Sequence, residues 1–147
     1  MSIEVSYITF VRKLVKLLPE LKKKVLSPKQ NSLNNFFLGE IGEKTATNYL
    51  TNLGYQILSC NVVFKKYEIY IVALDPKTDE LVFVEVKTRK SKNFGHPSKA
   101  VHRVKLRSMK IGAELFLRYT DLQNFYRFDI ITITPGRVEH FKNITWP

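Results

Sequence analysis

Apolar positions recur at helical spacing in three segments of the chain. Residues 6–26 alternate apolar and cationic positions, and Pro19 is expected to kink or divide that helix. Residues 35–53 place their apolar side chains on one helical face, and Gly54 supplies a C-terminal stop. A third helix is predicted from the Gly95-His96-Pro97 turn to about Tyr119.

Five other segments have the composition and alternation of β-strands: residues 55–64, 67–74, 81–88, 127–134 and 137–144. A turn at residues 75–79 is short enough for the second and third strands to form an antiparallel hairpin. Pro135-Gly136 separates the last two strands. After the leader, the predicted order is α-β-β-β-α-β-β, which is an α/β fold.

The chain divides into a basic amphipathic leader with its linker, residues 1–34, and one domain, residues 35–147. Ser27-Pro28 breaks the leader helix, and residues 29–35 are polar. Three roles for the leader stay open. It packs on the domain or on a partner protein, it lies on a membrane surface with its lysine-rich face outward, or it tethers nucleic acid.

The composition allows a packed core, since 44% of the residues are hydrophobic and 12% are aromatic. No apolar run approaches the roughly 20 residues that cross a bilayer. Arg12, Lys13 and Lys16 interrupt what would be the apolar run of a secretory signal. Cys60 is the only cysteine, which excludes an internal disulfide and a cysteine-based zinc site, and we expect it to be a buried strand residue. A cytoplasmic location follows as an expectation.

The chain is strongly basic, with 24 Lys and Arg against 13 Asp and Glu and a formal net charge of +11. The leader holds only part of this excess, so the domain itself is basic. A charge of this size attracts polyanions, whether nucleic acid or anionic lipid. On the third predicted helix a basic face that we expect to contact phosphates is formed by Lys99, Arg103, Arg107 and Lys110. Arg89, in the loop before this helix, and Lys105 are further expected nucleic-acid contacts.

Strand alternation in residues 81–88 places Val82, Val84 and Val86 on one face and Glu85 and Lys87 on the other. An acid and a lysine on one strand face also occur as a solvated surface pair, so the pattern alone is weak evidence of a site. Lys105 falls among the inward positions of its helix. Because a buried ammonium is costly without a carboxylate, we expect Lys105 to approach the region of Glu85.

The run Phe83-Val84-Glu85-Val86-Lys87-Thr88-Arg89 resembles the signature of the YraN-like family of uncharacterised proteins. Other pieces match in order across residues 36–144: Gly42-Glu43, Gly54-Tyr55, Asn61, Glu68-Ile69, Gly95, Pro97, Lys105 and Arg127-Phe128-Asp129. That family resembles the restriction-endonuclease-like, or PD-(D/E)xK, superfamily and is similar to archaeal Holliday-junction resolvases. The resemblance implies a core of order αβββαβ, with a mixed sheet flanked by helices, and a homodimer.

The resemblance also implies a Mg²⁺- or Mn²⁺-dependent phosphodiesterase site. Glu43, Glu85 and Lys87 match its catalytic positions, and Glu85 would bind the metal with Glu68 as the other carboxylate within reach. The family's second-strand aspartate is replaced by Tyr70. A neutral phenol is a poor ligand for a hard cation, so metal binding is expected to be weak and cleavage impaired.

Three functions follow from the sequence. The first is a nucleic-acid-binding, nuclease-like protein, with DNA favoured over RNA, whose cleavage site is degenerate at Tyr70. The second is a working Mg²⁺-dependent nuclease that uses Glu43, Glu68, Glu85 and Lys87. The third is a membrane-surface or protein-interaction module that acts through residues 1–29. His96, His102 and His140 lack metal-ligand spacing, and we expect them at the surface or in turns.

Overall fold

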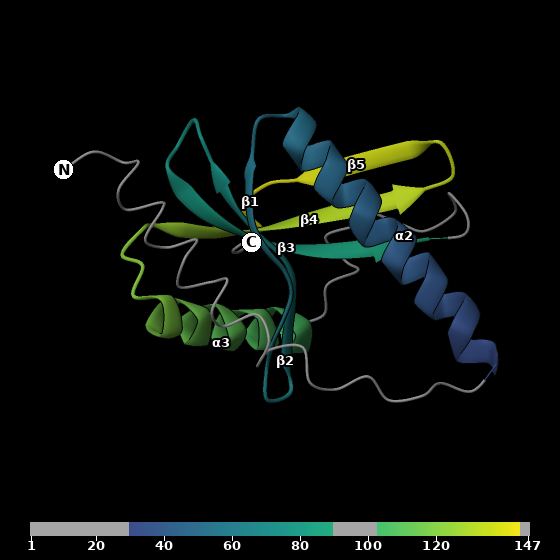
Figure 1. The fold of residues 1–147 in the computed structure, drawn as a ribbon, viewed down its shortest axis with the longest axis horizontal. Helices are drawn as coiled ribbons and strands as arrows, with labels where there is room; N and C mark the ends of the chain where they lie inside the picture. Colours follow the sequence, from purple (N-terminus) through teal and green to yellow (C-terminus); the bar gives the residue numbers. More distant parts are fainter. Residues whose placement is uncertain (1–29, 90–102, 145–147) are drawn as a thin grey trace.

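The computed structural model describes residues 30–89 and 103–144, with side chains from residue 39 onward (Figure 1). In order along the chain its elements are α2 (Gln30–Asn52), β1 (Gln56–Phe64), β2 (Tyr67–Asp75), β3 (Glu80–Thr88), α3 (Arg103–Thr120), β4 (Tyr126–Thr134) and β5 (Arg137–Phe141). The predicted order of elements is therefore confirmed. Helix α2 begins at Gln30, so residues expected to belong to a polar linker are helical. Residues 1–29, which include the predicted leader helix, lie outside the described residues, as do His96, Lys99 and His102.

The five strands form one mixed sheet in the order β1-β2-β3-β4-β5. Strands β3 and β4 are parallel, joined by the crossover that contains α3, and every other neighbouring pair is antiparallel. The predicted hairpin between the second and third strands is confirmed. Strand β3 lies at the centre of the sheet, so the segment carrying Glu85 and Lys87 has neighbours on both sides.

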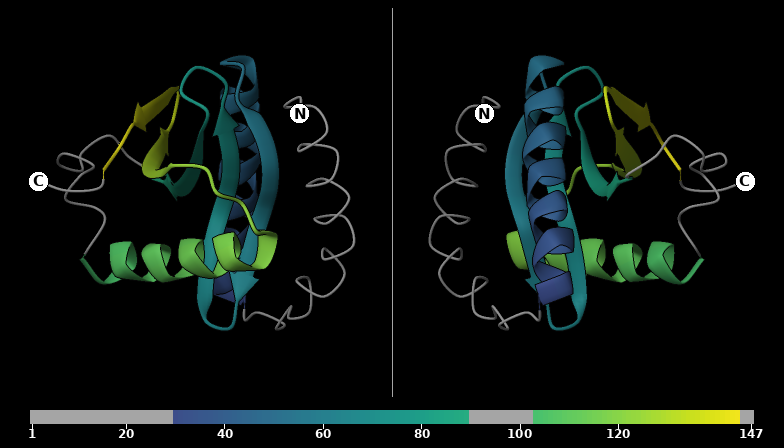
Figure 2. Two further views of the ribbon diagram at one scale, coloured as in Figure 1. Left: turned by 90° about the vertical axis from the view of Figure 1, so that its left-hand side faces the viewer. Right: turned by 90° about the vertical axis from the view of Figure 1, so that its right-hand side faces the viewer.

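The two helices cover opposite faces of the sheet (Figures 1 and 2). On one face, Phe83 packs with Met109 and Phe116 of α3. On the other, Val82, Val84 and Val86 pack with Ala46 and Leu50 of α2. Alternation along β3 therefore divides its side chains between two apolar layers, as the sequence predicted. Neither described helix is long and apolar enough to cross a membrane.

Both helices approach the sheet closely through a glycine. A Cβ atom on Gly42 would lie inside contact distance of Thr88 Oγ1, at the end of β3. A Cβ atom on Gly112 of α3 would lie 3.2 Å from Ile69 Cδ1 in β2. The first contact brings the neighbouring Glu43 to the end of β3, and the second seats α3 against the beginning of β2.

Strands β2 and β3 separate at one end. Their paired residues run from Asp75↔Glu80 to Ile71↔Val84, whereas the pairing of β2 with β1 continues to Phe64↔Tyr67. The first residues of β2 therefore follow β1 away from β3, and Figure 1 shows the β1–β2 hairpin bending out of the sheet. Tyr70 and Glu85 are the next residues beyond the last β2–β3 pair. They therefore lie at the point where β2 and β3 separate, which we call the fork.

The fork coincides with a backbone irregularity in β1. Asn61 has a φ of 53°, and it lies opposite Tyr70, between the pairs Cys60↔Ile71 and Val62↔Ile69. Asparagine tolerates this left-handed conformation better than most residues. Alternation is interrupted opposite this kink in β2, where Ile69 packs on the α3 side while Tyr70 and Ile71 pack on the α2 side.

Candidate nucleic-acid interface and acid–lysine site

Glu85 is the centre of a charged cluster at the fork. Only 1% of its side chain is exposed, and each carboxylate oxygen meets one ammonium group. Lys87 Nζ lies 2.7 Å from Oε1 and comes from the same strand. Lys105 Nζ lies 3.0 Å from Oε2 and comes from α3. The expectation that Lys105 approaches Glu85 is therefore confirmed.

The two lysines are the partners that compensate the charge of Glu85. Both carboxylate oxygens of Glu85 are buried, and among the described residues neither has a hydrogen-bond partner beyond these ion pairs. A buried carboxylate without a countercharge is strongly unfavourable. Lys87 and Lys105 are each about a third exposed, 31% and 28%, so they cover Glu85 while keeping contact with solvent.

Tyr70 lies beside this ion-paired group. Lys105 Nζ is 5.2 Å from the centroid of the Tyr70 ring, within the range of a cation–π contact. Burial raises the pKa of Tyr70 to about 12, and the charges of Glu68, Glu85 and Glu43 act in the same direction. The phenol therefore remains protonated at neutral pH and offers no anionic oxygen.

Glu43 and Glu68 complete the cluster from α2 and β2. Burial raises the pKa of Glu43; a hydrogen bond with the Asn61 side chain opposes this, and the charges of Glu68, Glu40 and Glu85 add to it. The charges of two glutamates far apart in sequence, Glu68 and Glu85, therefore act on Glu43. The fold brings Glu43, Glu68, Tyr70, Glu85, Lys87 and Lys105 into one region.

The donors at this site do not fit Mg²⁺ or Mn²⁺. Such ions prefer about six oxygen ligands at short range, with carboxylates among them. Across residues 30–89 and 103–144, no group of three or more His, Cys, Asp or Glu side chains is arranged to hold a metal ion. Lysine ammoniums already lie on both oxygens of Glu85. A divalent cation would have to displace one of them to bind Glu85.

The other predicted nucleic-acid contacts are spread along α3 and the end of β3. Arg103 and Arg107 are exposed on α3, and Lys110 is half-buried. Arg89 is half-buried, and its backbone N–H donates to the carbonyl of Ile133. Arg103 and Arg107 therefore extend the positive charge along the helix that supplies Lys105 to the site.

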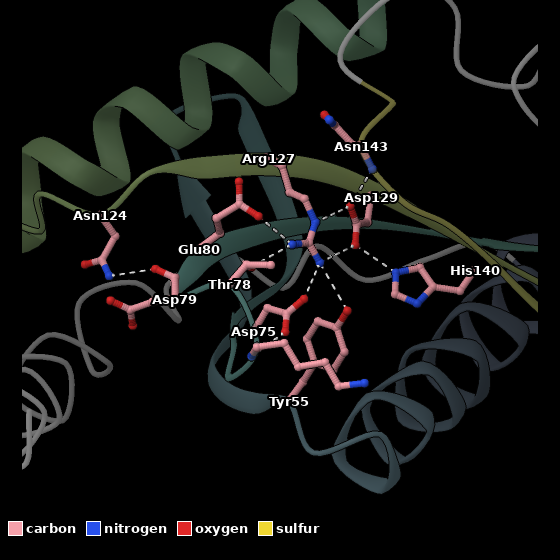
Figure 3. Close-up of polar contacts among 11 residues, drawn as sticks. Tyr55, Asp75, Thr78, Asp79, Glu80, Asn124, Arg127, Asp129, His140 and Asn143 are labelled. Atoms are coloured by element: carbon pink, nitrogen blue, oxygen red, sulfur yellow. Dashed lines mark hydrogen bonds and ion pairs between the residues drawn. The ribbon is translucent and has the colours of Figure 1, made fainter.

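A second polar cluster, which the sequence did not predict, is built on Arg127 of β4 (Figure 3). Its guanidinium is 7% exposed and pairs with three carboxylates: Asp75 at 2.8 Å, Glu80 at 2.8 Å and Asp129 at 3.1 Å. It also donates to the hydroxyls of Tyr55 and Thr78. These contacts tie β4 to the turn between β2 and β3 and to Tyr55, which lies between α2 and β1.

His140 belongs to the same cluster, so its expected position at the surface or in a turn is wrong. Its side chain is 4% exposed, and Nε2 lies 2.8 Å from Asp129 Oδ2. The rings of Tyr49 and Tyr55 meet it edge to face. The alternation of Arg127 and Asp129 on one strand face is the sequence signal that could have predicted a buried ion pair here.

This cluster predicts a loss of stability in acid. Although burial opposes it, Arg127 and the backbone N–H of Lys77 hold the pKa of Asp75 below its ordinary 3.8, and His140, Asn143 and Arg127 do the same for Asp129. Because the folded-state pKa is the lower one, this stabilisation is complete above the ordinary value and disappears as the pH falls through the folded value. Urea unfolding between about pH 6 and about pH 3 should show the free energy of unfolding falling below about pH 4. The fall should be smaller in Asp129→Asn, and an equal fall in both proteins would contradict this assignment.

The fold and site define an α/β domain with a mixed sheet whose central strand presents an acid–lysine pair. The chain belongs to the uncharacterised protein family UPF0102, whose model matches residues 42–133. A UPF0102 protein of Caldicellulosiruptor saccharolyticus is 41% identical over 102 residues, which cover 69% of this chain and 85% of that protein. One from Chlorobium phaeobacteroides is 41% identical over 111 residues, 71% of this chain and 86% of that protein. The YraN-like resemblance is thereby confirmed.

Proposed function

We propose that this chain is a nucleic-acid-binding, nuclease-like protein of the cytoplasm whose phosphodiesterase site is impaired. One observation carries the proposal. Glu85, at the position of the catalytic acid, is neutralised on both oxygens by Lys87 and Lys105, and the adjoining Tyr70 supplies a protonated phenol in place of a carboxylate. The αβββαβ order and mixed sheet support the relation to the restriction-endonuclease-like superfamily.

The surface charge supports nucleic acid as the ligand. The chain carries +11, and the exposed Arg103 and Arg107 lie on the helix that supplies Lys105. Lysine and arginine contacts to phosphates release counterions, which makes binding sensitive to salt and tolerant of sequence. We therefore expect binding to the backbone of DNA, with less dependence on base identity.

Nucleic-acid binding is tested by fluorescence anisotropy with labelled duplex, branched and single-stranded DNA and with RNA. The logarithm of affinity should fall linearly with the logarithm of salt concentration. Replacing both Arg103 and Arg107 by alanine should weaken binding to all these ligands and reduce the salt slope by about 1 for each phosphate that is no longer neutralised. Arg118→Ala is the matched control, because Arg118 is exposed in the last turn of the same helix. Affinity that does not respond to salt would contradict phosphate contact.

A working metal-dependent nuclease is the second candidate function. The charges of Glu68 and Glu85, which help to raise the pKa of Glu43, favour it, because an acidic neighbourhood attracts a cation. In this alternative Glu68 would bind the metal in place of the aspartate that Tyr70 replaces. Mn²⁺-dependent cleavage of DNA by the native chain, abolished by Glu85→Ala, would establish the nuclease and overturn the impaired site.

A further inference from the structure

The contacts of Lys105 differ from those of an ordinary surface lysine. Its ammonium lies 3.0 Å from one oxygen of Glu85 and 5.2 Å from the centre of the Tyr70 ring. The carboxylate contributes a full negative charge, and the aromatic face contributes the negative part of its quadrupole. Glu85 of β3 and Tyr70 of β2 thus form a cation-binding site, and the cation that it binds is the Lys105 ammonium of α3.

This cation-binding site suits an ammonium group better than a divalent metal ion. A divalent ion needs several oxygen ligands at about 2.0–2.6 Å. The Tyr70 ring offers its face to Lys105, and a phenol is a poor ligand for a hard cation. The second oxygen of Glu85 is taken by Lys87 at 2.7 Å. A metal arriving at Glu85 would meet one carboxylate, two ammoniums and no further anionic oxygen from Tyr70.

The cation that Glu85 meets is supplied by the chain itself. Because the Lys105 side chain is covalently part of the protein, its ammonium lies against Oε2 of Glu85 without a metal having to be recruited.

We infer that Lys105 is the built-in cation of this site and takes the place of a divalent metal ion against Glu85. The native chain consequently engages its phosphodiester ligand without Mg²⁺ or Mn²⁺. The identity of that ligand rests on the proposed function, whereas the replacement of the metal by an ammonium rests on the contacts of Lys105 alone. Removing the ammonium, or adding a carboxylate at Tyr70, should create a metal site that the native chain lacks.

The test compares thermal unfolding of the full chain in millimolar MnCl₂ and in EDTA. The native midpoint should be the same in both solutions. Lys105→Met keeps the length of the side chain and removes its charge, so Mn²⁺ should raise the midpoint of this variant by roughly 2–6 °C. Lys105→Arg retains a cation and should show no rise. Lys77→Met makes the same chemical change in the exposed turn between β2 and β3 and should also show none.

A second measurement decides the matter if Lys105→Met does not fold. The electron paramagnetic resonance signal of free Mn²⁺ reports binding directly, and the native chain should leave that signal unchanged. Tyr70→Asp retains Lys105 and adds a carboxylate, so this variant should diminish the signal. Binding of Mn²⁺ by the native chain that disappears in Glu85→Gln would overturn the inference.

Nucleic-acid binding in EDTA and in Mg²⁺ at matched ionic strength separates this inference from the proposed function. Equal affinity in the two solutions supports both. Binding that requires Mg²⁺ overturns the built-in cation and leaves the proposed function standing. If no nucleic acid binds under either condition, the proposed function fails, and the Mn²⁺ response of Lys105→Met still decides the role of Lys105.

Discussion

Replacing Arg127 by methionine is expected to lower the free energy of unfolding by about 3–5 kcal/mol. The guanidinium is 7% exposed, and it is the cation that pairs with Asp75 and Asp129, whose side chains are 4% and 0% exposed. Methionine fills much of the same volume but leaves these carboxylates buried with less compensating charge. Equilibrium unfolding in urea at neutral pH measures the difference, provided that the m-value is unchanged.

Arg137→Met is the matched control for this prediction. Arg137 Nη2 also lies 2.8 Å from a carboxylate oxygen, that of Glu139, but its side chain is 64% exposed. A solvated pair of this kind contributes about 0–1 kcal/mol, so the control should change stability little. Adding Asp75→Asn to Arg127→Met should recover part of the lost stability, because it removes the charge of one buried carboxylate that no longer has its arginine partner. Equal losses in Arg127→Met and Arg137→Met would show that burial does not determine the effect.

The sequence predicted the parts of the site that depend on local periodicity. Alternation along β3 was sufficient to place Glu85 and Lys87 on one face, since a central strand with neighbours on both sides remains regular. The helical wheel of α3 was sufficient to direct Lys105 inward, where only a carboxylate makes an ammonium favourable. These predictions use one element at a time, and each element keeps its ideal period.

Other features depend on contacts that no local pattern records. The fork between β2 and β3 arises where Asn61 adopts a positive φ, and apolar periodicity does not indicate that kink. Cys60 was expected to be buried, but it lies next to this kink on the edge strand β1 and is exposed. Arg127 and Tyr55, which are 72 positions apart, hydrogen-bond only because the fold brings β4 next to the connection between α2 and β1. Such pairs require the topology to be known first.

The largest expected effect on activity is a gain of cleavage in Tyr70→Asp. The substitution removes a phenol that stays protonated, its pKa being about 12, and adds a carboxylate at the fork beside Glu85. With two carboxylates at this point, a divalent cation would compete with the lysine ammoniums far better than it would for Glu85 alone. We expect Mn²⁺-dependent nicking of supercoiled plasmid and of branched DNA at least about 100-fold above the native chain.

The controls for this gain separate charge from shape. Tyr70→Asn opens the same space without a negative charge, and it should remain inactive because a neutral amide does not attract the cation strongly enough. Combining Tyr70→Asp with Glu85→Gln should abolish the new cleavage, since it removes Glu85, the carboxylate at the position of the catalytic acid. Cleavage by Tyr70→Asn equal to that of Tyr70→Asp would show that the tyrosine blocks access to the site by its bulk. In that case the missing negative charge would not be the cause of the impairment.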